Sequence, residues 1–237
     1  MTDDRETALR QCDKHGDYTA HWVQRLDRWT GCETCAHEER AANQLLLDEE
    51  YRQERIEEWL RESDIPSKFR HAAFDGSLPE KLRRWVEAVA RRESRGPLVI
   101  IGPVGTGKTY ASSAALKQII RSDMRGLFIT AGGYGRTVRE TWNRRGEHTE
   151  ASLLGKYGCV PVLVLDEFGA NRDVDAPMLQ DLISARYDEG RMPNTIIVSN
   201  LAVAKFPDVA GERVADRIKE DATVLLMTGK SKRTPLA

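Results

Sequence analysis

A glycine-rich turn at residues 102–109 constrains the fold of this chain more than any other feature. The turn reads GPVGTGKT, fits the pattern G-x-x-x-x-G-K-T, follows the apolar run LVII and precedes a run of helix-forming residues. In that strand–loop–helix context, glycines let backbone N–H groups converge on a phosphate at the positive end of the helix. The segment therefore predicts a nucleotide-binding loop within an α/β fold.

Two side chains of this loop have specific expected roles. Lys108 is expected to reach the β- and γ-phosphates of ATP, and the Thr109 hydroxyl is expected to ligate Mg²⁺. The full set of residues expected to bind the nucleotide is Gly102, Pro103, Val104, Gly105, Thr106, Gly107, Lys108, Thr109 and Tyr110.

Three polar residues end later apolar runs. Asp166, in VPVLVLDEFG, is expected at the carboxyl edge of a strand, where it can hold Mg²⁺ through water. Glu167 beside it can orient and deprotonate the water that attacks the γ-phosphate. Asn200 ends TIIVSN at the same expected edge and can hydrogen-bond the γ-phosphate or that water. Asparagine after a strand is also a common turn former, which is the alternative for Asn200.

Short apolar runs alternate with helix-forming segments from residue 80 onwards. We expect strands at residues 98–101, 127–130, 160–165, 195–199 and 223–227, with helices between them such as 108–122 and 176–189. Continuous apolar runs are typical of strands buried on both faces, so the expected fold class is α/β with a five-stranded parallel sheet. Residues 38–63 lack Gly and Pro, which favours a long helix ending before Pro66. The expected domains are a module at 1–37, a helical linker at 38–65 and a nucleotide-binding domain at 66–237.

Charge is divided unevenly along the chain. Residues 1–65 hold 9 Lys/Arg and 17 Asp/Glu, whereas residues 66–237 hold 27 and 20. The basic part is therefore the better candidate for binding a phosphate backbone. No apolar stretch approaches the ~20 residues needed to cross a membrane, and the first residues lack the apolar core of a signal peptide. We expect a cytoplasmic protein without membrane association.

The N-terminal region contains two pairs of metal-binding residue types, C-x₂-H and C-x₂-C, separated by sixteen residues. Each x₂ turn brings two donors onto one ion, so the spacing predicts a structural Zn²⁺ site with no open position. His21 and His37 are rival ligands, and Cys159, just before an expected strand, is expected in the core. The expected zinc ligands are Cys12, His15, Cys32 and Cys35.

A basic segment, residues 131–158, separates the second and third expected strands. Its arginines are interleaved with Tyr134 and Trp142, and cations beside stacking faces suit single-stranded DNA. The alternative is a solvated helix with Trp142 in the core, and residues 81–95 are then the next candidate for the contact. The expected DNA-binding residues are Arg136, Arg139, Trp142, Arg144 and Arg145.

Four segments in this order and at this spacing, GPVGTGKT, VLVLDEFG, IIVSN and GERVADRI, resemble the DnaC/IstB family of AAA+ ATPases. That family comprises replicative helicase loaders and transposition helper ATPases, and the likeness covers about residues 64–233. IPSKFRHAAFDG resembles the segment that lines the adenine pocket in those proteins. Only ten residues follow Met227, so the resemblance implies an AAA+ domain without a C-terminal lid.

The resemblance also implies self-association through the ATP interface. In that family the GERV-x-D-R element supplies an arginine to the ATP of a neighbouring subunit, and Arg217 matches that position best, with Arg213 the second choice. A guanidinium that neutralises charge on the transferring phosphoryl group accelerates hydrolysis by about 10³-fold or more. The alternative is a surface helix with charges spaced i,i+4.

The function implied is ATP-dependent loading of a hexameric replicative helicase onto single-stranded DNA, by a loader of phage or bacterial type. ATP, Mg²⁺ and structural Zn²⁺ are the implied cofactors, and the N-terminal module is expected to dock on the helicase. One alternative is an IstB-like transposition helper, which partners a transposase. The other is an adaptor that binds ATP without hydrolysing it, and the intact Lys108, Asp166 and Glu167 argue against that alternative.

Overall fold

The computed structural model describes residues 6–94, 96–142, 148–170 and 176–229. The contacts divide the chain into two compact units, Met1–Arg55 and Ile56–Ala237. Helix α1 (Glu33–Glu62) contributes residues to both units, and it begins at Glu33 rather than at residue 38 as the composition suggests. None of the helices in the described part of the chain is long and apolar enough to cross a membrane.

The N-terminal unit contains a small antiparallel sheet. Strand β1 (Thr7–Cys12) pairs with β2 (Gly16–Val23), which pairs in turn with β3 (Arg28–Trp29). Across β2 and β3, the rings of Trp22 and Trp29 meet edge to face with centroids 5.4 Å apart. Such cross-strand aromatic pairs stabilise short sheets that bury little else.

The C-terminal unit contains the predicted five-stranded parallel sheet, in the order β5-β6-β7-β4-β8. The strands are β4 (Leu98–Ile101), β5 (Gly126–Thr130), β6 (Val162–Phe168), β7 (Thr195–Ser199) and β8 (Thr223–Leu226). Nearly every residue of β4 to β7 is buried, as expected for strands that are covered on both faces. The prediction of an α/β fold is confirmed.

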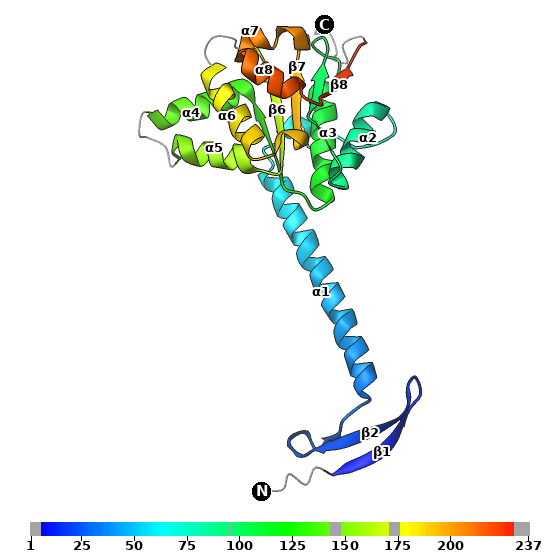
Figure 1. Cartoon of the computed structure of the whole chain (residues 1–237). Helices are drawn as coiled ribbons and strands as arrows, with labels where there is room; N and C mark the ends of the chain where they lie inside the picture. The colour runs from blue at the N-terminus through cyan, green and yellow to red at the C-terminus, as the bar shows by residue number, and fades with distance from the viewer. Residues whose placement is uncertain (1–5, 95, 143–147, 171–175, 230–237) are drawn as a thin grey trace. The chain divides into compact units, whose positions relative to one another are not determined.

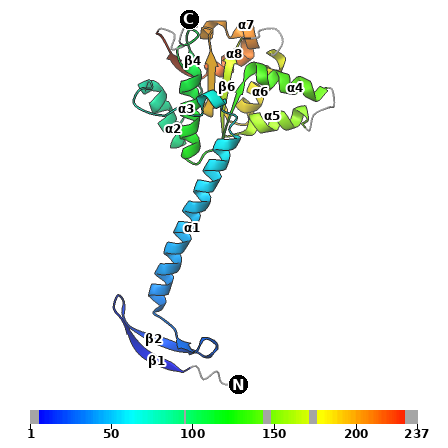
Figure 2. The same cartoon turned by 180° about the vertical axis from the view of Figure 1, so that it is seen from behind.

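Helices cover both faces of this sheet. In Figures 1 and 2, α2 (Glu80–Ala90) and α3 (Lys108–Arg121) lie on one face, while α4 (Ala131–Trp142), α5 (Glu150–Cys159) and α6 (Ala176–Asp188) lie on the other. Two short helices, α7 (Pro207–Ala210) and α8 (Glu212–Lys219), precede β8. Alternate strand residues serve the two cores: Leu163 packs with the α4–α6 layer, and Val164 packs with the α2–α3 layer.

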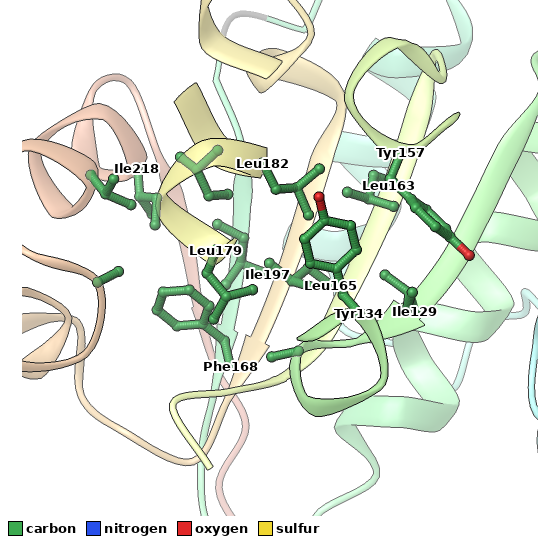
Figure 3. Packing of buried hydrophobic residues seen from close by; sticks show 14 of the residues in the cluster. Ile129, Tyr134, Tyr157, Leu163, Leu165, Phe168, Leu179, Leu182, Ile197 and Ile218 are labelled. Carbon is green, nitrogen blue, oxygen red and sulfur yellow. The ribbon is translucent and has the colours of Figure 1, made fainter. Parts of the chain in front are cut away.

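Figure 3 shows the core beneath α4, α5 and α6. The rings of Tyr134 and Tyr157 meet edge to face with centroids 5.7 Å apart, and Tyr134 is only 2% exposed. Tyr134 is therefore a core residue and offers no stacking face to DNA, which corrects the expectation from its place among arginines. Tyr134 shares one face of α4 with Ala131, Gly135 and Val138, and this face is buried against the sheet.

Arg186 of α6 is a fully buried cation. Its guanidinium donates to the backbone carbonyls of Tyr157, Gly158, Val160 and Arg191, and to the Thr195 hydroxyl, at 2.9–3.1 Å. Burial lowers the pKa of Arg186 to about 9. The side chain thus ties the end of α5, its C-cap residue Val160 and the start of β7 to α6.

Cys159 lies outside the core, contrary to the prediction. It is exposed because it is the last residue of α5, and β6 begins only at Val162. The apolar run starts before the strand does, so the position of Cys159 could not be read from the run.

Candidate nucleotide-binding site and metal cluster

The loop between β4 and α3 has the backbone that its glycines permit. Gly102, Gly105 and Gly107 have φ values of 153°, 87° and 93°, which side-chain-bearing residues rarely adopt. A Cβ at Gly102 would also lie 2.1 Å from the carbonyl oxygen of Met227. The loop turns sharply and delivers the chain into α3 at Lys108, so the first amides of α3 face the loop.

Lys108 is buried at the start of α3, and its ammonium lies inside the curve of the loop. Nζ donates to the carbonyl oxygens of Gly102 at 2.7 Å and Pro103 at 2.8 Å. The positive charge is thereby held where the loop amides converge, at the place where a phosphate group is expected to bind.

Thr109 and Asp166 are in direct contact, although they lie far apart in the sequence. The Thr109 hydroxyl donates to Asp166 Oδ2 at 2.8 Å, and the Glu167 amide donates to Asp166 Oδ1 at 2.8 Å. Burial raises the pKa of Asp166, while the two hydrogen bonds oppose that rise. A hydroxyl and a carboxylate at this separation are oxygen ligands of the kind that Mg²⁺ takes, directly or through water.

An open cavity of about 1000 Å³ joins these residues. Glu167 and Asn200 are exposed side chains on its wall, the first near the carboxyl end of β6 and the second directly after β7. Three lining residues, Lys68, Phe69 and Ser77, come from the segment before α2. The remaining lining residues are Val104, Gly105, Gly107, Lys108, Thr109, Tyr110, Asp166, Val198 and Ser199.

The segment before α2 is fixed to α3 by two side chains. The Tyr110 hydroxyl accepts a hydrogen bond from the Ala73 amide at 3.1 Å, and Lys117 Nζ donates to the carbonyl oxygens of Arg70 and Ala72. Lys117 carries no motif, and only its position on α3 under residues 70–73 reveals this role. The family resemblance predicted that IPSKFRHAAFDG lines the adenine pocket, but it did not predict the role of Lys117.

The arginines of α8 do not line the cavity of their own chain. Arg213 is exposed, whereas the Arg217 side chain is 12% exposed. The guanidinium of Arg217 lies 4.5 Å from the ring centroid of Tyr187 and 3.5 Å from Asp188 Oδ1. Arg217 is thus engaged within its own subunit, and Arg213 is the more accessible of the two.

The expected DNA-binding residues fall in α4 and the segment after it. Arg136 is exposed, and Arg139 is half-buried with Nη1 4.0 Å from the sulfur of Met178. Trp142, at the end of α4, is 60% exposed and donates to Glu150 at 3.4 Å, so it is not a core residue. Arg144 and Arg145 lie outside the described residues.

The four predicted zinc ligands come together in the N-terminal unit. The donor atoms of Cys12, His15, Cys32 and Cys35 all lie within 4.8 Å of one another. His15 Nδ1 is 3.3 Å from Cys35 Sγ, and the sulfurs of Cys12 and Cys35 are 3.5 Å apart. Four ligands at Zn–S distances of about 2.3 Å would be separated by similar distances, so the cluster fits a tetrahedral ion.

The surroundings of the cluster also suit a metal. His15 Nε2 is 3.1 Å from Glu38, the kind of carboxylate contact that orients a metal-bound histidine. Hydrogen bonds from the backbone amides of Lys14 and His15 lower the pKa of the Cys12 thiol, which favours the thiolate that binds metal. The rivals His21 and His37 are not members of the cluster.

The loop, the Thr109–Asp166 pair and a parallel sheet in this strand order define an AAA+ nucleotide-binding protein of the phosphate-loop class. The chain belongs to the family of IstB-like ATP-binding proteins, whose sequence model matches residues 29–235. Membership of the DnaC/IstB group, expected from the four sequence segments, is therefore confirmed.

Two curated relatives come from the two branches of this group. The replicative helicase loader DnaC of Buchnera aphidicola is 27% identical over 123 residues, which are 51% of this chain and 49% of DnaC. An ATP-binding protein of insertion sequence IS21 from Pseudomonas aeruginosa is 26% identical over 168 residues, 68% of this chain and 61% of the relative. The chain spans about half to three fifths of the length of these relatives.

Two solved structures share the fold. The DnaC helicase loader has a TM-score of 0.58 at 23% identity, covering 69% of this chain and all of that one. DnaI has a TM-score of 0.56 at 22% identity, covering 72% of this chain and 95% of that one.

Proposed function

We propose that this chain binds ATP with Mg²⁺ and hydrolyses it. The observation that carries this proposal is the hydrogen bond between Thr109 and Asp166 in a cavity that Glu167 and Asn200 also line. A bound Mg²⁺ would supply positive charge against the phosphate oxygens, with Thr109 and Asp166 holding it.

Each side chain around the cavity then has one role. Lys108 pairs with the β- and γ-phosphates, and Glu167 accepts the proton of the attacking water. Asn200 orients that water or the γ-phosphate from the neighbouring strand. Lys68, Phe69 and Ser77 lie where the segment before α2 meets the cavity, and we assign them to the base and sugar side of the nucleotide.

We further propose that hydrolysis drives the loading of a hexameric replicative DNA helicase onto single-stranded DNA in the cytoplasm. The likeness to DnaC supports this role, and so does an N-terminal module that suits protein contact. A transposition helper is the second candidate, because the IS21 relative covers more of this chain. The domains proposed are residues 1–37 for the zinc module, 38–65 for the helical linker and 66–237 for the ATPase.

Partner contacts are proposed for three surfaces. The zinc module would dock on the helicase, the exposed Arg136 and Trp142 with Arg139, Arg144 and Arg145 would contact single-stranded DNA, and α8 would contact the ATP of a second copy. Cation and aromatic side chains together suit unpaired bases. An exposed arginine that does not line the site of its own subunit suits assembly in which neighbours complete each other's site.

A loading assay separates the two candidate roles. A closed hexameric ring must open before it can encircle a covalently closed single strand, so unwinding of an oligonucleotide annealed to that circle, above the level with helicase alone, reports loading. We expect unwinding with the wild-type chain and ATP, and none with Lys108→Ala. No unwinding together with ATP-dependent stimulation of an IS21-type transposase would transfer the assignment to transposition.

A further inference from the structure

Strand β6, which contains Asp166 and Glu167, is irregular near its carboxyl end. β6 and β7 pair in register as far as Leu165 and Ile197, and the next pair joins Phe168 to Ser199, so β6 contains one extra residue. Glu167 lies in this bulge with a φ of 56°, a conformation that residues other than glycine seldom adopt. The surroundings must hold Glu167 in this backbone conformation.

One hydroxyl closes the bulge. Ser199 is fully buried, and its Oγ donates to the carbonyl oxygen of Phe168 at 2.7 Å while accepting from the Leu201 amide at 3.0 Å. Phe168 directly follows Glu167, and Leu201 directly follows Asn200. The same hydroxyl therefore ties the backbone behind Glu167 to the backbone on both sides of Asn200.

The residues that follow the two strands also pack closely against each other near Ser199. Gly169 has a φ of 83°, and a Cβ there would meet Leu201 Cδ1 at 2.6 Å. The turn after β6 and the turn after β7 therefore lie against each other. Because the turns after β6 and β7 pack against each other and share the Ser199 hydroxyl, loss of that hydroxyl is expected to shift Glu167 and Asn200 relative to one another.

We propose that Ser199 is a positioning residue for hydrolysis: its hydroxyl holds the Glu167 carboxylate and the Asn200 amide in the mutual arrangement that the attacking water requires. This inference rests on the proposed ATPase function. Small displacements of catalytic groups cost rate rather than affinity, by about 10²-fold for an error of 1 Å. The Ser199 hydroxyl bonds Phe168 and Leu201, whereas Lys108 bonds Gly102 and Pro103, so we expect nucleotide binding to change little.

The test compares Ser199→Ala with Ser199→Thr and with a matched control, Ser113→Ala. Ser113 is also fully buried, and among the described residues its hydroxyl has no hydrogen-bond partner. Turnover at saturating ATP, the ATP dissociation constant and the melting temperature are measured for each. We expect Ser199→Ala to lose about tenfold or more in kcat with ATP affinity within about twofold of wild type. Ser199→Thr should recover most of the rate, and Ser113→Ala should match wild type.

A double variant distinguishes positioning from general weakening. If Ser199 acts through Asn200 and Glu167, Ser199→Ala should cost much less in an Asn200→Ala background than in the wild type. If Ser199→Ala is too unstable to assay, the near-isosteric Ser199→Cys should fold and show the same loss of kcat. Wild-type turnover in a folded Ser199→Ala or Ser199→Cys overturns the inference, as does equal loss of kcat and ATP binding. Absence of turnover in wild type would instead contradict the proposed ATPase function.

Discussion

In the proposed function, Lys108 and Glu167 act on different parts of the same nucleotide. The ammonium of Lys108 bonds the carbonyls of the loop between β4 and α3, while Glu167 and Asn200 line the same cavity from β6 and the end of β7. Binding and hydrolysis should therefore be separable by substitution, because the first depends on charge at the loop and the second on a positioned base.

Substitution of Lys108 should impair ATP binding, whereas substitution of Glu167 should impair hydrolysis of bound ATP. Lys108→Ala should abolish measurable ATP binding, whereas Glu167→Gln should bind ATP and lose about 10²-fold or more in kcat. Fluorescent-nucleotide titration and a phosphate-release assay measure the two quantities. Equal ATP affinity in wild type and Lys108→Ala would refute the assignment of the loop.

Arg186 should be among the most sensitive residues for stability. Arg186→Met removes the guanidinium donor from the buried carbonyl groups of Tyr157, Gly158 and Val160, at about 1–3 kcal/mol for each group that finds no other partner. The Arg191 carbonyl still accepts from the Thr195 hydroxyl and the Asn194 amide. We expect the free energy of unfolding to fall by roughly 3 kcal/mol or more, measured by denaturant titration. Arg186→Lys should rescue little, since an ammonium has three donors and cannot reach five acceptors.

An exposed arginine provides the control for this measurement. Arg84→Met removes a surface ion pair with Glu80 and should change the free energy of unfolding by less than about 1 kcal/mol. Similar losses for the two variants would contradict the role assigned to Arg186.

At the scale of secondary-structure elements, the cysteine–histidine cluster brings the β1–β2 turn together with the beginning of α1. Cys12 ends β1, His15 lies in the turn, and Cys35 is in the first turn of α1. The small sheet buries few residues, so a metal crosslink would supply much of its stability.

The purified protein should accordingly contain about one zinc per chain. Cys32→Ser should lose the metal and unfold residues 6–32, while leaving ATP binding intact, because the loop and its partners lie in the other unit. Cys159→Ser, at an exposed cysteine outside the cluster, is the matched control and should retain the metal. The zinc content is measured on protein prepared in reducing buffer without chelator. Wild-type protein that contains no zinc under these conditions would contradict the prediction.

Helix α4 and the basic segment after it should bind single strands with little sequence preference. Replacing Arg144 and Arg145 with Ala removes up to two phosphate contacts, which should flatten the slope of log K against log salt by roughly one unit. Trp142→Ala should weaken binding by about 1–3 kcal/mol with little change in slope, because a stacked base carries no released counterion.

Fluorescence titration across a salt series separates these two signatures. Arg121→Ala, at an exposed arginine on α3, should leave both affinity and slope unchanged. If the two arginines of the segment have no effect on DNA affinity, the contact must be sought elsewhere, and the basic residues of α2 come next.

At the scale of the whole molecule, one subunit gathers the residues proposed to bind phosphate, and neither α8 arginine lines their cavity. Arg217 would have to leave Tyr187 and Asp188 to reach a neighbour, whereas Arg213 is exposed as it stands. We expect Arg217→Ala or Arg213→Ala to bind ATP normally and hydrolyse it poorly, depending on which one serves the neighbouring site.

Mixing subunits tests that expectation. A ring of Lys108→Ala and arginine-variant subunits contains some interfaces with an intact loop on one side and an intact arginine on the other, so part of the activity should return. An arginine variant that is as active as wild type by itself is excluded from the role. If mixing restores nothing for a variant that is inactive alone, the arginine acts within its own subunit.

Local sequence determined the features that depend on neighbours in the chain. The glycines of residues 102–109 permit the left-handed loop, whatever the rest of the fold does, and C-x₂-H with C-x₂-C sets the donor spacing within each half of the metal cluster. Continuous apolar runs predicted the buried parallel strands for the same reason, since a strand covered on both faces has no polar side.

The tertiary structure decided which side chains are buried and which distant residues they contact. The sequence around Tyr134 suggested an exposed ring among arginines, but in the structure Tyr134 is buried in the core. The sequence around Cys159 suggested a core residue, but Cys159 is exposed at the end of α5. The partners of Arg186 and Ser199 come from other elements, so no spacing along the chain reveals them. Hydrogen bonds between distant segments exist only once the sheet order has placed those segments side by side, and this is why sequence alone could not supply them.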